Sequence, residues 1–91
     1  MSVKVRLHPY LRKFTSGQEV VEAVGRTIGD CIDDLETRFP GIKRRLCDEQ
    51  GNLHSFYSVY VNSSDGFYPE ELSSPVKDGD ELIIVTVVPG G

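Results

Sequence analysis

The feature that most constrains the fold is a strongly apolar segment at residues 81–88. Six of its eight residues are apolar, and they occupy both of the alternating positions of an extended chain. Because successive side chains of a strand point to opposite faces of a sheet, this segment presents apolar groups to both faces. That pattern is typical of a strand with neighbours on each side. The sequence therefore predicts a sheet with residues 81–88 at its centre, entered through the tight turn Asp78-Gly79-Asp80.

Three further segments are predicted to complete the sheet. Residues 3–8 alternate between apolar and polar side chains, and residues 18–24 follow a turn signal at residues 15–17, so the two segments predict a β-hairpin. Residues 56–62 alternate again and predict a third strand. Residues 67–68 are expected to form a short edge strand, because Pro69 cannot donate a hydrogen bond to a sheet ladder.

One helix stands out between the second and third strands. Thr27 and Asp30 have the spacing of a capping box, with Thr27 as N-cap. An apolar stripe with helical spacing follows, and Pro40-Gly41 ends it. The stripe contains Ile28, Cys31, Ile32, Leu35 and Phe39. A helix that covers one face of a mixed sheet of four to five strands is an α+β arrangement.

Length and charge limit the classes of function. A chain of 91 residues has room for one domain with a modest core, which we place at residues 1–91. Its formal net charge of −4 argues against a nucleic-acid partner, and Lys43-Arg44-Arg45 is interpreted as a solvated surface turn. No run approaches the ~20 apolar residues that span a bilayer, and residues 1–6 lack a signal-peptide core, so we expect no membrane and a cytoplasmic protein.

The sequence offers little conventional active-site chemistry. Cys31 and Cys47 form no C-x-x-C pair, and with His8 and His54 they match no zinc-ligand spacing, so no metal site is expected. Cys31 is expected to be buried on the helix stripe, whereas the polar surroundings of Cys47 favour exposure. The carboxylates of Asp78, Asp80 and Glu81 are expected to be exposed and ionised at their turn, and a catalytic role for them is disfavoured.

The last five residues, Val87-Val88-Pro89-Gly90-Gly91, suggest a different chemistry. Two glycines give a main chain without Cβ atoms, which is slim enough to enter a narrow channel. A terminal carboxylate is an anion at neutral pH and a poor electrophile, so another protein has to activate it. Adenylation by ATP would make a mixed anhydride that sulfur, nitrogen or oxygen nucleophiles attack.

Taken in order, these features resemble the MoaD/ThiS family of ubiquitin-like sulfur carriers, over essentially all 91 residues. The features are the first strand, the helix that ends at Phe39-Pro40-Gly41, the strand with Val59-Tyr60-Val61-Asn62, the turn at residues 78–81, and Gly90-Gly91. The resemblance implies a β-grasp fold with a flexible tail at residues 87–91.

The resemblance also implies the chemistry and the partners. Gly91 would be adenylated by an E1-like enzyme that uses ATP, a sulfur donor would displace AMP, and the thiocarboxylate would pass sulfur to an acceptor biosynthetic enzyme such as a synthase large subunit. The protein itself would be a carrier, with no bound cofactor, and not an enzyme. Six residues are implied to contact partners: Gly90, Pro89, Val88, Phe56, Tyr60 and Ile84.

Several alternatives stay open at this level. The length favours a carrier of the molybdopterin type or the cysteine type over the shorter thiamin-pathway carriers. Many family members have a proline a few residues before the glycines, where this chain has Thr86, and here Pro89 lies directly before Gly90. A second function is a ubiquitin-like modifier joined through Gly91 to lysines of target proteins. A third is a β-grasp interaction module that never uses its tail.

Overall fold

Strand β5, Glu81–Thr86, is the middle strand of a mixed five-stranded sheet in the computed structural model, which describes residues 2–63 and 66–86. The strand order is β2-β1-β5-β3-β4, which confirms the predicted central strand. β1 and β5 are parallel, and the other neighbouring strands are antiparallel. The remaining strands are β1 (Ser2–Arg6), β2 (Val20–Val24), β3 (Tyr57–Ser63) and β4 (Gly66–Glu70).

Strand boundaries differ from the prediction mainly at the ends. β4 is an edge strand, as expected, but it continues through Pro69 to Glu70 and does not stop before the proline. Pro69 is paired with Tyr60 of β3 in the register of the two strands. β5 is described to Thr86, and the predicted extension to Val87 and Val88 lies outside the described residues.

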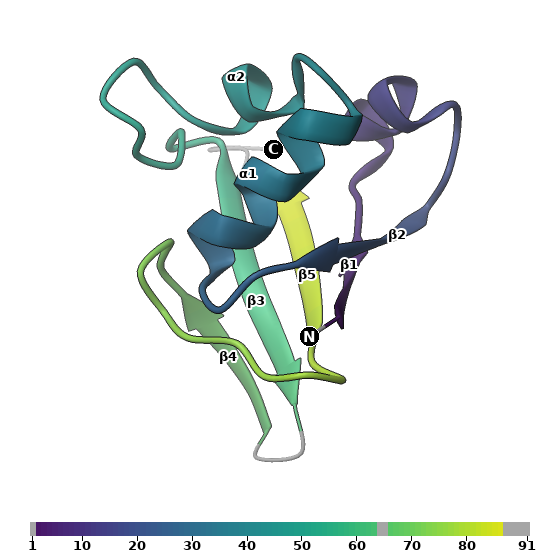
Figure 1. Cartoon of the computed structure of the whole chain (residues 1–91). Coiled ribbons are helices and arrows are strands. Elements are labelled where there is room, and N and C mark those ends of the chain that lie inside the picture. Colours follow the sequence, from purple (N-terminus) through teal and green to yellow (C-terminus); the bar gives the residue numbers. More distant parts are fainter. Residues whose placement is uncertain (1, 64–65, 87–91) are drawn as a thin grey trace.

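Alternation places the core on one face of the sheet. Val3 and Val5 of β1 pair with Ala23 and Val21 of β2, and all four side chains are buried. The same face continues in β3 and β5 with Tyr57, Val59, Val61, Leu82 and Ile84. Figure 1 shows α1 over this face of the sheet. No helix among residues 2–63 and 66–86 covers the opposite face, which we call the uncovered face.

Helix α1, Ile28–Arg38, covers the core and matches the predicted helix closely. The Thr27 hydroxyl accepts a hydrogen bond from the Asp30 amide at 3.1 Å, which confirms the N-cap. Four residues of the predicted stripe are buried, namely Ile28, Cys31, Ile32 and Leu35, and Phe39 packs against them. Because one stripe carries the apolar side chains, α1 buries that face in the core and leaves its polar face to solvent.

Two short helices were not predicted. The 3-10 helix η1, Pro9–Thr15, lies between β1 and β2, and the α-helix α2, Ile42–Leu46, follows α1. The Lys43-Arg44-Arg45 run therefore lies on a helix and not on a surface turn, which corrects the prediction. α2 buries Ile42 and Leu46, and this packing supplies stability that five residues of helix propensity cannot.

The turn before β5 also differs from the expectation. Asp80 was predicted to be exposed, yet only 6% of its surface is accessible. Its carboxylate accepts a hydrogen bond from the Lys77 amide at 2.9 Å, and its backbone carbonyl accepts one from the Lys4 amide at 3.1 Å. Asp80 is therefore a structural residue that joins the turn to β1.

A bilayer-spanning helix, which would have to be long and apolar, does not occur among the residues that the structure describes.

Candidate functional site

The predicted reactive residue, Gly91, follows strand β5 in the chain. Gly91, Gly90, Pro89 and Val88 lie outside the described residues. Thr86 is the last residue of β5 and of the described chain, and we call it the root of the tail. The arrangement of side chains around Thr86 therefore defines the surface from which residues 87–91 continue.

The root is connected to two other segments. Thr86 pairs with Tyr57 at the start of β3, and its hydroxyl lies 3.3 Å from Nε2 of His8. The Nδ1 atom of His8 accepts a hydrogen bond from the Tyr10 amide at 3.2 Å. Because Nδ1 acts as an acceptor, the neutral ring carries its proton on Nε2 and donates it to Thr86. His8 therefore links the N-terminus of η1 to the end of β5.

The uncovered face of the sheet carries one of the predicted partner-binding residues. Tyr60 of β3 pairs with Ile83 of β5, and both side chains are half-buried, as is Val85. Charged and polar groups border them, since Glu81 accepts hydrogen bonds from Arg6 at 3.1 Å and from Asn62 at 3.3 Å. The structure thus places Tyr60 on a mixed apolar and polar face, and its role in binding a partner stays a prediction.

Ile84 does not lie on that face. Its side chain is 2% exposed and belongs to the core beneath the helices. Alternate residues of β5 face opposite sides of the sheet, and both sets are aliphatic. The sequence prediction therefore assigned Ile84 to the wrong side. Ile83 and Val85 occupy the uncovered face instead.

Phe56 lies on a different surface, at the end of the sheet beside the root. Its side chain is 60% exposed, and it lines a groove of about 310 Å³ that also includes Thr86. We call this the root groove. Its lining consists of Tyr10, Arg44, Arg45, His54, Phe56, Tyr57 and Thr86. The structure therefore separates Phe56 from Tyr60 and Ile84, with which the sequence analysis grouped it.

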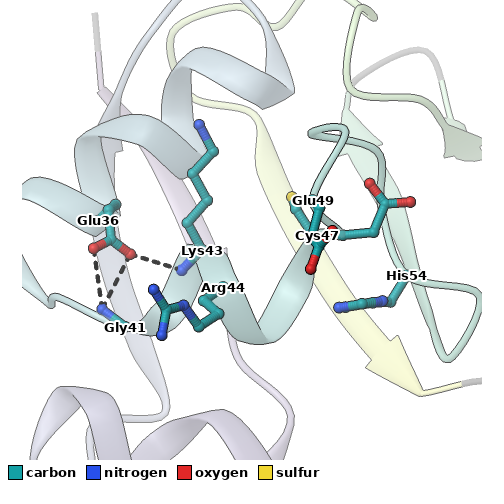
Figure 2. A pocket seen from close by; sticks show the side chains of 8 residues that line it. Glu36, Gly41, Lys43, Arg44, Cys47, Glu49 and His54 are labelled. Carbon is teal, nitrogen blue, oxygen red and sulfur yellow. Dashed lines mark hydrogen bonds between the residues drawn. The ribbon is translucent and has the colours of Figure 1, made fainter.

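A larger and shallower hollow of about 840 Å³ adjoins α2 and is shown in Figure 2. The carboxylate of Glu36 accepts hydrogen bonds from the backbone amides of Gly41 and Lys43, at 3.1 and 2.9 Å. These two amides hold the pKa of Glu36 below its ordinary value, the Lys43 amide having the larger effect. Glu36 therefore has a structural role, because it caps the N-terminus of α2, whose own N-cap residue, Gly41, has no side chain.

Neither cysteine is placed for nucleophilic chemistry. Burial raises the pKa of the Cys31 thiol to about 11. Cys47, which was expected to be exposed, is only 5% accessible, and burial raises the pKa of its thiol as well. Its position results from a backbone bridge to Leu53, which folds the following loop over it. Among residues 2–63 and 66–86, no group of three His, Cys, Asp or Glu side chains gathers where it could hold a metal ion.

Sequence reasoning missed most of the root groove. Tyr10, Arg44, Arg45 and His54 come from η1, α2 and the loop before β3, and no local motif connects them. The topology brings them together, because β1, β3 and β5 all have an end near Thr86. The available signals were Phe56, an aromatic residue next to polar ones, and the Lys43-Arg44-Arg45 run, which was interpreted as a solvated surface turn.

The chain matches a known family and known relatives over nearly its whole length. Residues 5–91 match the model of the ThiS family. The sulfur carrier protein CysO of Mycobacterium tuberculosis is 41% identical over 93 residues, which covers 100% of both chains.

Two solved structures have the same fold as this chain. A chain of the Amycolatopsis orientalis BexX/CysO complex superposes with a TM-score of 0.84 at 43% identity, covering 98% of this chain and 99% of that one. SAMP1 from Haloferax volcanii superposes with a TM-score of 0.80 at 26% identity, covering 100% of both chains. The predicted β-grasp fold is confirmed by these likenesses and by the sheet order.

Proposed function

This chain belongs to the ThiS family, and from that premise we propose that it carries sulfur as a thiocarboxylate on Gly91. An E1-like enzyme would catalyse attack of the Gly91 carboxylate on the α-phosphorus of ATP, which releases pyrophosphate and forms an acyl adenylate. Sulfide would then attack the acyl carbon, form the carbon–sulfur bond and displace AMP. The resulting thiocarboxylate is a nucleophile that an acceptor enzyme can use.

The observation that carries the proposal is similarity over the full length to proteins named as sulfur carriers, at 41% identity, within a family match that includes Gly90 and Gly91. The relatives are named as carriers and not as catalysts, which supports a co-substrate role. Likeness to CysO favours a carrier of the cysteine type, so the molybdopterin type is no longer favoured.

The geometry around Thr86 is compatible with activation of Gly91 by a separate enzyme. β5 has a neighbouring strand on each side, and Thr86 at its end is paired with Tyr57 of β3. Five residues follow it, and a fully extended segment of that length spans at most about 17 Å. An activating enzyme can therefore bind the folded domain outside its channel while Gly91 reaches ATP.

The test is in vitro thiocarboxylation. The full chain is incubated with ATP, sulfide and the E1-like enzyme of the same genome, and its intact mass is measured. We expect the mass change of one oxygen replaced by sulfur, located at Gly91 by fragmentation. A chain lacking Gly91 is the matched control and should stay unchanged. Absence of the mass change with every E1-like enzyme of the host would refute the proposal.

A second function is favoured by one finding, the likeness to SAMP1, which is described as a small archaeal modifier protein. The same acyl adenylate would then react with lysine amines and form isopeptide bonds. Peptides with Gly-Gly remnants on lysines of other host proteins, lost when Gly91 is deleted, would support it. Thiocarboxylate without such remnants would exclude conjugation as the main role.

A further inference from the structure

We propose that the root groove binds an acidic, carboxylate-bearing loop of the E1-like enzyme at the entrance to its catalytic channel. The inference rests on the proposed function, since it concerns the partner that receives the tail. It assigns a role to Tyr10, Phe56, Arg44 and Arg45, which the carrier chemistry itself does not use.

Two aromatic side chains form exposed walls of the groove. Tyr10 is 59% exposed and Phe56 is 60% exposed, and among the large apolar side chains that the structure describes only Val24 is comparably exposed. Each ring lies beside a histidine: His8 is 4.5 Å from Tyr10 between ring centroids, and His54 is 6.2 Å from Phe56. Aromatic side chains held in place at a surface are the residues that most often carry binding energy in interfaces.

The charges of the groove are positive, although the chain has a formal net charge of −4. Arg44 and Arg45 of α2 are both exposed. Four other cations are paired: Arg6 and Arg12 with Glu19, Arg38 with Asp34, and Lys43 with Asp33. Lys4, Lys13 and Arg26 form no ion pair within residues 2–63 and 66–86, but they do not line the root groove. None of the ion pairs formed within the described ranges includes Arg44 or Arg45. Two guanidinium groups without a carboxylate partner are complementary to an acidic surface.

The backbone that presents these arginines is fixed. Glu36 caps α2 through the amides of Gly41 and Lys43, and Leu46 is buried beneath the helix. The carbonyl of Leu46 accepts a hydrogen bond from the His54 amide at 2.8 Å, so α2 is attached to the loop that carries Phe56. α2 and the loop that carries Phe56 are therefore joined by a hydrogen bond, which lowers the cost of ordering these two segments when a partner binds.

The position of the root groove beside the tail indicates which part of the enzyme it binds. Thr86 lines the groove, and at most about 17 Å of extended chain separates it from Gly91. An enzyme that holds Gly91 at ATP must therefore bring the rim of its channel close to the root groove. On the uncovered sheet face, by contrast, Arg6 is already paired with Glu81, so that face offers less positive charge to an acidic loop.

The test measures the dissociation constant between the full chain and the E1-like enzyme of the same genome by titration calorimetry. Arg44→Glu and Arg45→Glu should each weaken binding about tenfold. This loss should shrink as salt rises from about 0.1 M to about 1 M, because the screening length falls from about 10 Å to about 3 Å. Phe56→Ser should weaken binding by a similar factor that salt does not change. Arg26→Glu, an equal charge change at the opposite end of the sheet, is the control and should change binding less than twofold.

Each result is informative. If the wild-type chain gains sulfur at Gly91 while the groove variants bind as tightly as Arg26→Glu, the groove inference is wrong and the proposed function stands. If the wild-type chain neither binds the enzyme nor gains sulfur, the proposed function fails and the inference fails with it. If the groove variants lose only self-association, or only binding to the acceptor enzyme, the assignment of the groove to the E1-like enzyme is also wrong. Circular dichroism spectra identical to wild type confirm that the variants are folded.

Discussion

The two ends of the sheet use their polar groups differently. At the end opposite the root, which we call the closed end, backbone and side-chain groups bind one another. The Ser2 amide donates to Asp78 at 2.8 Å, the Gly79 amide donates to the Ser2 carbonyl at 3.1 Å, and the Ile28 amide donates to the Ser74 carbonyl at 3.1 Å. The first two bonds fasten the turn before β5 to β1, and the third fastens the start of α1 to the loop that precedes that turn.

The root end retains groups that the fold does not need. It carries the exposed rings of Tyr10 and Phe56 and the arginines of α2, arranged around Thr86, and Figure 1 shows η1, α2 and the end of β5 at this end of the molecule. A small domain can therefore satisfy its own hydrogen bonds at one end and keep exposed groups for recognition at the other. Substitutions at the closed end should therefore change stability, and those at the root end should change binding.

The largest loss of stability is expected for Gly25→Ala at the closed end. A Cβ atom at Gly25 would lie 2.7 Å from the Cβ of Asp30 and 2.8 Å from the Cys31 amide nitrogen, so the first turn of α1 must move. Overpacking of this kind costs about 3 kcal/mol of unfolding free energy. Urea unfolding measures the loss. Val24→Ala, at an exposed neighbour, is the control and should cost less than about 1 kcal/mol; equal losses would contradict the close packing inferred here.

A smaller, pH-dependent loss is expected for Glu36→Gln, which weakens the cap of α2. The pKa of Glu36 in the folded protein is lowered from its ordinary value of 4.5 by the Lys43 and Gly41 amides. The ionised carboxylate therefore contributes stability that is complete above pH 4.5 and is lost as the pH falls through the lowered pKa. Melting temperatures of both proteins should differ at pH 7 and converge in acid. A difference that stays constant with pH, or an equal one for Glu49→Gln, would argue against the cap.

The smallest effect on stability is expected for Phe56→Ser in the root groove. Because the ring is 60% exposed, its removal should change the unfolding free energy by no more than about 0.5 kcal/mol. The same urea experiment measures it, with Gly25→Ala as the contrasting variant. A loss approaching that of Gly25→Ala would show that Phe56 supports the fold, and the contrast between the two ends would not hold.

Sequence reasoning found the elements that have a strong local signal. α1 was predictable from the Thr27 cap and the apolar stripe, and β5 from its composition. α2 was not, because its cap is Glu36, a side chain of the preceding helix, and its five residues have no periodicity to detect. The same reason explains Asp80 and Cys47, whose burial depends on tertiary contacts with β1 and with Leu53.

The candidate site was predictable in part. The chemistry at Gly91 depends on a local feature, the pair of glycines, and it stays a proposal because Gly91 lies outside the described residues. The surface beside it depends on which strand ends meet, and that required the sheet order. Phe56 was identified as a partner-binding candidate, but the groove that it shares with Arg44 and Arg45 became visible only in three dimensions.

The central claim, that Gly91 carries sulfur, is tested most directly by the intact mass of the protein isolated from its own cells. The account predicts a population in which sulfur replaces one oxygen of the terminal carboxylate, and this population should disappear when the gene for the activating enzyme is deleted. A protein that keeps an unmodified carboxylate in sulfur-replete cells, with and without that gene, would contradict it.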